Sequence, residues 1–167
     1  MNLNPIWDNF FDNNVNHVTI DFLKSISLFE NLKSNEIARL ERTLHTRYYK
    51  KDEIVFKEDE PGAALYIIKE GKVDIYINHE TSPILLATLE KGMFFGELAL
   101  FDATPRSATI VASKDTVLIA LSKPDFILFS QKEPAIGNKI VMRLGKILSK
   151  RLRLANEQIE ELKSLHV

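Results

Sequence analysis

The chain has 167 residues, of which 45% are hydrophobic, so it is long enough for one domain with a substantial core and too short for two ordinary ones. Its net charge of −1 excludes an overall positive field that would attract nucleic acid or an anionic membrane surface. It has no cysteine, which excludes disulfides, thiolate nucleophiles and cysteine-ligated zinc, and fits a reducing compartment.

Neither a secretory signal nor a membrane span is predicted. The N-terminal stretch MNLNPIWDNFFDNN lacks the basic region and the long apolar region of a secretory signal. Apolar runs such as PILLATL (residues 83–89) are far below the ~18 residues that a spanning helix needs. We therefore expect a soluble, cytoplasmic protein without a membrane partner.

The first part of the chain, to about His45, has helical patterns. The segment after Asn4, which begins with Pro5, fits a short amphipathic helix and a mobile tail equally well. Residues 19–26, TIDFLKSI, predict a helix with apolar residues on adjacent faces. Ser34 is predicted to cap the next helix, whose apolar residues recur at helical spacing. These are Ile37, Leu40 and Leu44.

The second part, about residues 46–122, predicts short strands rich in β-branched and aromatic residues. The segments are EIVFKE, ALYIIKE, KVDIYIN, PILLATLE, SATIVAS and TVLIALS. Between them, Gly62 in DEPGA and Gly71 in KEGK are expected to supply the positive φ of tight turns. Strands of this length and spacing predict a small antiparallel barrel or sandwich.

The third part predicts a short helix, DFILFSQK, started by Ser122 or Asp125, and then a long helix from Pro134 to about Leu165. On the long helix, one set of residues is spaced alternately by four and three, as in a coiled-coil seam. The seam consists of Val141, Gly145, Leu148, Leu152, Ala155, Ile159 and Leu162. A second face is expected to pack on the domain and consists of Ile136, Ile140, Leu144 and Ile147. We expect a parallel homodimer through the seam, of modest stability because glycine and alanine occupy two of its positions.

One polar pair interrupts the apolar stretch FFGELALFDATPRSATI, residues 94–110. Gly96 lets the backbone approach a ligand, and the short helix after it would have unpaired N–H groups. Arg106, held by Pro105 and followed by Ser107, can grip two oxygens of a phosphate. Glu97 only accepts hydrogen bonds and suits a sugar hydroxyl. A solvated arginine and a glutamate that complements a helix dipole remain the alternative at this point.

The same stretch resembles the phosphate-binding cassette of cyclic nucleotide-binding domains. The matching positions are Phe95, Gly96, Glu97, Leu98, Ala99, Leu100, Pro105, Arg106, Ser107 and Ala108. The resemblance extends over about residues 25–160, since SLFENLKSNEIARL is similar to the family's helical entry and EPGAALYIIKEGKVDIYI to its first strands. It implies an α+β fold, a small antiparallel β-barrel or jelly roll with N-terminal helices and a long C-terminal helix.

The resemblance also implies roles for individual residues. Arg106 and Ser107 would bind the exocyclic phosphate oxygens, and Glu97 would hold the ribose 2′-hydroxyl. Backbone N–H groups would assist the phosphate site, from Gly96, Glu97, Leu98, Ala99 and Ala108. No metal is expected, because one arginine balances the single charge of a cyclic phosphate, and no G-x-x-x-x-G-K-[ST] motif for a nucleoside triphosphate is present.

The resemblance also implies that two positions of the long helix reach the ligand, when this helix is aligned residue by residue with the long helix of the family. Arg151 falls where an arginine pairs with the glutamate, here Glu97. Asn156 falls where a residue of the partner subunit meets the base, although the neighbouring family threonine is Ala155 here, so part of that contact is absent. We expect cyclic AMP (cAMP) as the ligand. Ser107 leaves a preference for cyclic GMP (cGMP) as the alternative.

We therefore expect a regulatory sensor that acts on an unidentified downstream protein, and no enzyme. Catalysis such as cyclic nucleotide hydrolysis needs a metal cluster or an acid–base set, and the histidines are scattered. They are His17, His45, His79 and His166. Arg106 and Glu97 are both intact, which argues against a domain that has lost its ligand.

A DNA-binding role is not expected for this chain by itself. The bacterial catabolite activators continue past their long helix into a helix-turn-helix domain, whereas this chain stops at Val167. The basic stripe of the long helix, Lys146, Lys150, Arg151 and Arg153, is interpreted as a solvated face. A fragment of a larger transcription regulator stays open as an alternative. The predicted organisation is an N-terminal helical extension (1–24), a cyclic nucleotide-binding β-roll (25–133) and a dimerisation and lid helix (134–167).

Overall fold

The computed structural model describes residues 15–102 and 104–164. It begins with three short helical elements, α2 (Val15–Ser25), η1 (Ser27–Phe29) and α3 (Ser34–Glu41). Eight strands follow, interrupted once by the 3₁₀ helix η2 (Glu97–Leu100), and α4 (Lys123–Lys132) and α5 (Pro134–Ser164) complete the fold. The helix considered after Pro5 lies outside the described residues.

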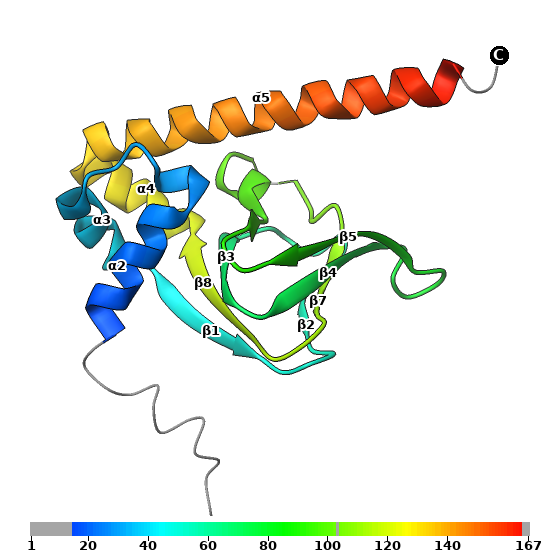
Figure 1. Ribbon diagram of the computed structural model, residues 1–167, viewed down its shortest axis with the longest axis horizontal. Coiled ribbons are helices and arrows are strands. Elements are labelled where there is room, and N and C mark those ends of the chain that lie inside the picture. Colours follow the sequence, from blue (N-terminus) through cyan, green and yellow to red (C-terminus); the bar gives the residue numbers. More distant parts are fainter. Residues whose placement is uncertain (1–14, 103, 165–167) are drawn as a thin grey trace, which may run out of the picture.

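Two four-stranded antiparallel sheets form the β-roll, in the orders β1-β8-β3-β6 and β2-β7-β4-β5 (Figure 1). The strands are β1 (His45–Tyr49), β2 (Ile54–Phe56), β3 (Ala64–Glu70), β4 (Lys72–Ile77), β5 (Ile84–Glu90), β6 (Phe94–Phe95), β7 (Thr109–Ala112) and β8 (Thr116–Ser122). Apolar side chains from both sheets meet between them, because alternate residues of each strand point inward. This cluster contains Ile68, Val73, Phe95, Ile110 and Leu118.

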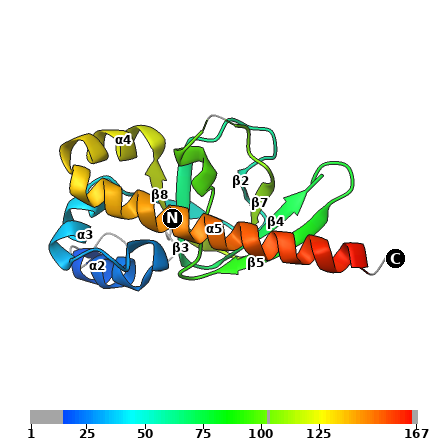
Figure 2. The ribbon, with the colours of Figure 1, turned by 90° about the horizontal axis from the view of Figure 1, so that it is seen from above.

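The helices gather at one end of the β-roll, and α5 then runs across its top (Figures 1 and 2). Residues from α2, α3, α4 and the first half of α5 share one core, which contains Leu23, Ile37, Phe126 and Ile140. Two residues of α5, Lys139 and Arg143, fix it to the N-terminal helices. Lys139 pairs with Glu36 at 2.8 Å, and Arg143 donates to the carbonyl of Ser27 at 2.8 Å.

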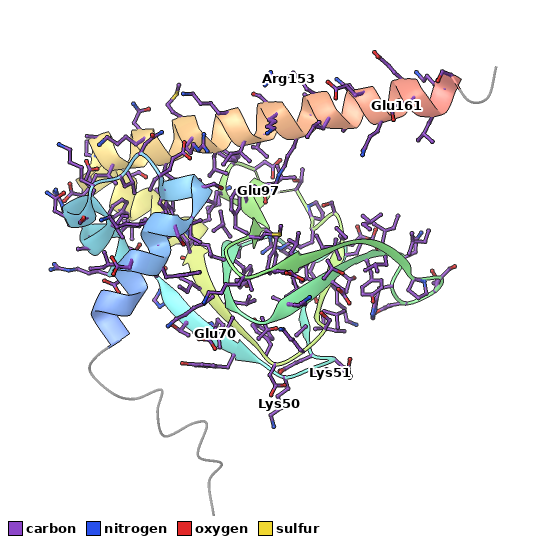
Figure 3. The ribbon with its side chains drawn as sticks, viewed as in Figure 1. Lys50, Lys51, Glu70, Glu97, Arg153 and Glu161 are labelled. Carbon is purple, nitrogen blue, oxygen red and sulfur yellow. The ribbon has the colours of Figure 1, made fainter. Side chains whose placement is uncertain are left out.

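The long helix has the two faces expected from its sequence. Ile136, Ile140 and Leu144 are at most 2% exposed, and Ile147 packs against the same core. The residues of the predicted seam lie outside the core, with Leu152 63% exposed and Ile159 49% exposed. The second half of α5 extends beyond the helical layer, with side chains such as Arg153 and Glu161 in the open (Figure 3).

The α+β fold class predicted from the sequence is confirmed, and the six predicted strand segments all contain strands. Two strands were not predicted individually. The edge strand β1 is exposed at four of its five positions, so it shows no clear alternation, and β6 has only two residues. Ser122 caps α4 as predicted, because its hydroxyl accepts from the backbone N–H of Asp125 at 3.1 Å.

Two local predictions are wrong. Ser34 is not the cap of α3; that position is Lys33, whose backbone N–H donates to the Glu36 carboxylate at 2.8 Å. Gly62 does not have a positive φ, which in this turn belongs to Asp59 at +66°. Glycine is needed at 62 for space, since a Cβ there would lie 2.9 Å from Ala99 Cβ. Gly71, at φ +96°, is as predicted.

No helix among the described residues is both long and apolar enough to cross a lipid bilayer.

Gly71 and Gly92 both have a positive φ, so alanine at either position would strain the backbone, but only at Gly71 would the added Cβ also lack space. Gly71→Ala would place its Cβ 2.6 Å from the Thr116 Cα, whereas Gly92, at φ +86°, has nothing within 4 Å of that position. We expect Gly92→Ala to lower the free energy of unfolding by about 1 kcal/mol and Gly71→Ala by about 2–4 kcal/mol. Urea denaturation of the two variants measures this, and equal losses would contradict the packing of the β3–β4 turn against Thr116.

Candidate functional site

The stretch that carries Glu97 and Arg106 folds around one glycine. Strand β6 ends at Phe95, Gly96 takes a left-handed conformation with φ +73°, and η2 begins at Glu97. A Cβ at Gly96 would lie 2.7 Å from Arg106 Nη1 and 3.0 Å from the Ala64 carbonyl oxygen. Only glycine combines this φ with this space, so the backbone of the stretch lies directly against the arginine side chain.

The Arg106 guanidinium is held by carbonyl groups. The residue is only 8% exposed, and its Nη2 donates to the Ala64 carbonyl at 2.9 Å and its Nη1 to the Gly96 carbonyl at 3.2 Å. Its Nε is buried and has no hydrogen-bond partner in the described part of the chain. Arg106 also makes no ion pair with any described residue. A buried cation without a counterion is unfavourable by itself and favours an anion as ligand.

Burial lowers the pKa of Arg106 from its ordinary value, and the nearby Tyr66, Glu60 and Glu97 oppose this effect. The direction means that the protonated guanidinium has lost solvation that the protein restores incompletely. A bound anion would restore it.

The turn at residues 59–62 supports Arg106 from the other side. The backbone N–H of Asp59 donates to the Arg106 carbonyl at 2.9 Å, and the Arg106 N–H donates to the Glu60 carbonyl at 2.8 Å. Pro61 and Pro105 form an isolated antiparallel bridge between the same segments. These contacts fix the stiff corner that the sequence predicted from Pro105.

Glu97 lies beneath α5 and is 6% exposed (Figure 3). Its Oε1 accepts a hydrogen bond from Arg151 Nη1 at 2.6 Å, which is the pairing expected from the sequence. The Arg151 side chain is 50% exposed, and its guanidinium carbon lies 5.2 Å from the centre of the Phe94 ring. Arg151 therefore links the second half of α5 to the floor of the site.

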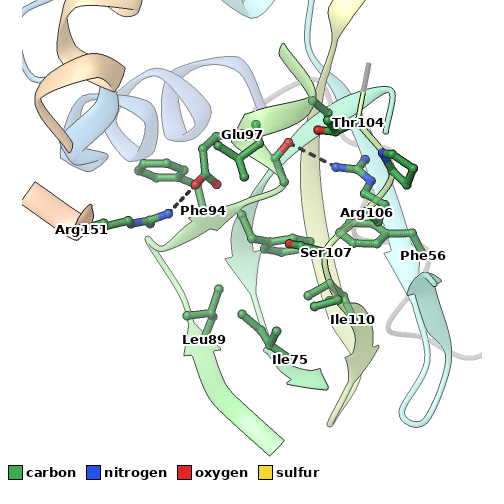
Figure 4. A pocket seen from close by; sticks show the side chains of 16 residues that line it. Phe56, Ile75, Leu89, Phe94, Glu97, Thr104, Arg106, Ser107, Ile110 and Arg151 are labelled. Carbon is green, nitrogen blue, oxygen red and sulfur yellow. Dashed lines mark hydrogen bonds and ion pairs between the residues drawn. The ribbon is translucent and has the colours of Figure 1, made fainter. Parts of the chain in front are cut away.

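These residues line one cavity of about 530 Å³, a volume suited to a small ligand (Figure 4). The polar end contains Glu97, Arg106 and Ser107, and the other end is apolar. The apolar end is formed by Ile75, Leu89 and Ile110, and the rings of Phe56 and Phe94 line the cavity beside Arg106 and Arg151. The arrangement can bind an anion at Arg106 and a hydroxyl group at Glu97, with a flat or apolar group against the strands.

Eight of the nine residues predicted for the site line this cavity. They are Gly96, Glu97, Leu98, Ala99, Arg106, Ser107, Ala108 and Arg151. Asn156 does not line it and is exposed on α5 of the single chain. The apolar lining was missed, because alternation along a strand shows that a residue faces inward and not that the space beside it is empty.

In the described part of the chain, no three His, Cys, Asp or Glu side chains are grouped so that they could hold a metal ion.

The family model of the cyclic nucleotide-binding domain matches residues 46–133, more than half of the chain. The chain belongs to this family. It is 31% identical to the cyclic AMP receptor protein of Thermus thermophilus over 139 residues, which cover 83% of this chain and 62% of the relative. It is 36% identical to human cGMP-dependent protein kinase 2 over 99 residues, 58% of this chain and 13% of the kinase. The chain thus spans less than two thirds of each of these relatives.

Solved structures agree with this assignment. The Thermus thermophilus catabolite activator protein superposes with a TM-score of 0.74 at 31% identity, over 82% of this chain and 63% of that one. A cyclic nucleotide-binding domain from Methylobacillus flagellatus gives a TM-score of 0.75 at 26% identity, over 87% and 83% of the two chains.

The ion pair between Arg151 and Glu97 gives a prediction about the protein without ligand. Arg151→Met leaves the buried Glu97 carboxylate without its cation, so we expect a loss of stability that Glu97→Gln in the same chain partly restores. The coupling free energy should be about 1 kcal/mol, because one partner is half exposed. Urea denaturation of both single variants and the double variant measures it. Lys150→Met is the control with little effect, and strictly additive losses would contradict the coupling.

Proposed function

We propose that this chain is a sensor that binds cAMP in the cavity and signals by a rearrangement of α5. The observation that carries the proposal is the Arg106 guanidinium, 8% exposed, without an ion pair among the described residues and at the polar end of a cavity of about 530 Å³. A cyclic phosphate is a monoanion that offers two exocyclic oxygens to this group. Arginine binds such oxygens in a planar fork.

In this proposal different side chains of the cassette bind the phosphate and the ribose of the ligand. Arg106 and Ser107 bind the phosphate, together with N–H groups of residues 96–99 and 108. Glu97 accepts the ribose 2′-hydroxyl with Oε2, because Arg151 already occupies Oε1. A ligand at Glu97 thereby meets α5 through Arg151, which gives the binding event a route to the exposed half of the helix.

Dimerisation through α5 belongs to the same proposal. Its seam is exposed in the single chain except at the half-buried Leu148, and no described residue lies within 4 Å of the Cβ position of Gly145. A glycine inside a helix costs about 1 kcal/mol relative to alanine, and no contact among the described residues accounts for it. Close approach of a second α5 does. Figure 2 looks down on α5 from above, and no other described element covers the side of the helix that faces the viewer.

A parallel pair of α5 helices would also bring Asn156 to the cavity. When the seam residues are assigned to the a and d positions of a heptad repeat, Arg151 occupies a g position and Asn156 occupies the e position of the next heptad. In parallel coiled coils, g of one helix lies beside the next e of its partner. The partner's Asn156 would then lie near Arg151 at the mouth of the cavity, and its amide can read the N6 and N7 edge of adenine.

One observation favours the alternative, a sensor that prefers cGMP. Ser107 lines the cavity, and a hydroxyl there can accept from the 2-amino group of guanine. The downstream protein, the three-part organisation, the non-catalytic role and the cytoplasmic location stay predictions. The whole protein's output also stays open, because the relatives are longer than this chain and can carry further domains.

Arg106→Ala tests the proposed binding directly. We expect it to cost ~2–5 kcal/mol of cAMP affinity, roughly 30-fold to several thousand-fold in Kd, because the phosphate loses its countercharge. Arg106→Lys should retain only part of the wild-type affinity for cAMP, because an ammonium group cannot make the planar fork. Calorimetric titration with cAMP and cGMP measures this, with the exposed Arg153→Ala as control. Unchanged affinity in Arg106→Ala would overturn the proposed site.

The dimer predicts a change in mass. Leu152→Glu combined with Ile159→Glu should give a monomer, because each substitution places a charge in the seam. Leu154 is 49% exposed but lies off the seam, so Leu154→Glu should remain dimeric. Light scattering of the purified variants distinguishes these results. A dimer in the doubly substituted chain would move the interface elsewhere.

Base recognition is tested at Asn156. Asn156→Ala should narrow the preference for cAMP over cGMP by ~1 kcal/mol or more, about fivefold, on the scale of one lost hydrogen bond. Gln158→Ala is the neighbouring control and should leave the ratio unchanged. If both variants keep the wild-type ratio, base selection lies in the β-roll and Ser107, and cGMP becomes the better candidate.

A further inference from the structure

The cavity contains an aromatic ring in direct contact with the phosphate-binding arginine. The centre of the Phe56 ring lies 4.0 Å from the Arg106 guanidinium carbon, within the range of a cation–π interaction. Phe56 is the last residue of β2 and lines the cavity beside Arg106 (Figure 4). Tyr66 is more distant from the same guanidinium, at 5.9 Å.

Two further rings hold Phe56 in place. Its centroid lies 5.9 Å from that of Tyr66 and 5.9 Å from that of Phe95. Tyr66 and Phe95 stack on one another with centroids 5.5 Å apart and an interplanar angle of 17°. Phe95 is 4% exposed, so the group is anchored in the core between the two sheets. Phe56 is thus the cavity end of a rigid aromatic cluster.

The hydrogen bonds of Arg106 do not fix the orientation of its whole guanidinium group, which the Phe56 ring can restrict. The two carbonyl bonds, to Ala64 and Gly96, hold the Nη1 and Nη2 ends of the guanidinium. Its Nε is buried and has no partner among the described residues, so hydrogen bonds leave that side of the group unconstrained. A ring face beneath the guanidinium carbon restricts tilting of the group.

We propose that Phe56 is a positioning residue for the phosphate site: its ring holds the Arg106 guanidinium in the plane in which it grips a cyclic phosphate. The inference rests on the proposed function and adds a residue outside the cassette stretch. The positioning role of Phe56 can be distinguished from a role in core packing. As a core residue, Phe56 would need only apolar volume, which leucine also supplies, whereas the positioning role needs an aromatic face.

The test compares Phe56→Leu with Phe56→Tyr in the full chain. Phe56→Leu should weaken cAMP binding roughly 3- to 30-fold, the scale of a partly desolvated cation–π contact, and Phe56→Tyr should bind like wild type. Tyr76→Leu, which removes a ring of the same β-roll outside the cavity, is the control and should also bind like wild type. Thermal unfolding of all three variants separates a loss of folding from a loss of binding.

A second measurement distinguishes orientation from affinity. The two phosphorothioate diastereomers of cAMP each replace one exocyclic oxygen with sulfur, and their affinity ratio reports how the arginine faces the two oxygens. Phe56→Leu should bring this ratio closer to one, and Phe56→Tyr should preserve it. A weaker Phe56→Leu variant with an unchanged ratio would overturn the positioning role and leave Phe56 as a packing residue.

A measurement without ligand keeps this inference separate from the proposed function. Stacking on Phe56 should shift the NMR signals of the Arg106 side chain upfield, and the shift should vanish in Phe56→Leu and persist in Phe56→Tyr. Its absence from the wild-type spectrum would overturn the positioning role even in a protein that binds cAMP. A wild-type chain that shows the shift but binds neither cAMP nor cGMP would overturn the proposed function and, with it, the role of Phe56 at a phosphate site.

Discussion

The burial of one guanidinium organises the site. Arg106 is 8% exposed and forms no ion pair within the described chain, so its charge is stabilised by carbonyl dipoles, by aromatic rings and by the charges of Glu60 and Glu97, which lie beyond ion-pair distance. The neighbouring backbone allows these groups to lie close to the Arg106 guanidinium. Gly96 lacks the Cβ that would meet Nη1, and the turn at residues 59–60 exchanges two backbone hydrogen bonds with Arg106. The same arrangement is unfavourable without a ligand and favourable with an anion, as expected for a binding site selected for function over stability.

The second organising contact joins this pocket to the long helix. The first half of α5 is fixed by the core at Ile136, Ile140 and Leu144 and by the pairing of Lys139 with Glu36. Beyond it, Arg151 contacts Glu97 inside the pocket and Leu152 is 63% exposed. In the proposed function, a ligand at Glu97 would act on α5 where core packing ends, which is the part of a helix that moves at the lowest cost.

Membership of the cyclic nucleotide-binding family settles the fold and leaves the output open. Similar segments occur in the cyclic AMP receptor protein of Thermus thermophilus, where they cover 62% of the relative, and in human cGMP-dependent protein kinase 2, where they cover 13%. Function in such a family depends on the site and on what the module is connected to.

The sequence by itself determined the main helices and every strand except β1 and β6, and its resemblance to the cassette implied the α+β class and the roles of Glu97 and Arg106. The elements follow from local patterns, namely the apolar spacing on α5 and the β-branched runs in the strands. The spacing of Glu97 and Arg106 alone left a solvated pair as the alternative, and the resemblance to the phosphate-binding cassette favoured a binding site. Only the tertiary structure decided that Gly62 is required for space against Ala99, that β1 forms an edge, and that Phe56 lies against Arg106. Each of these depends on two segments distant in the chain and on the volume between them, and a one-dimensional pattern contains no information about which inward-facing residues surround a void.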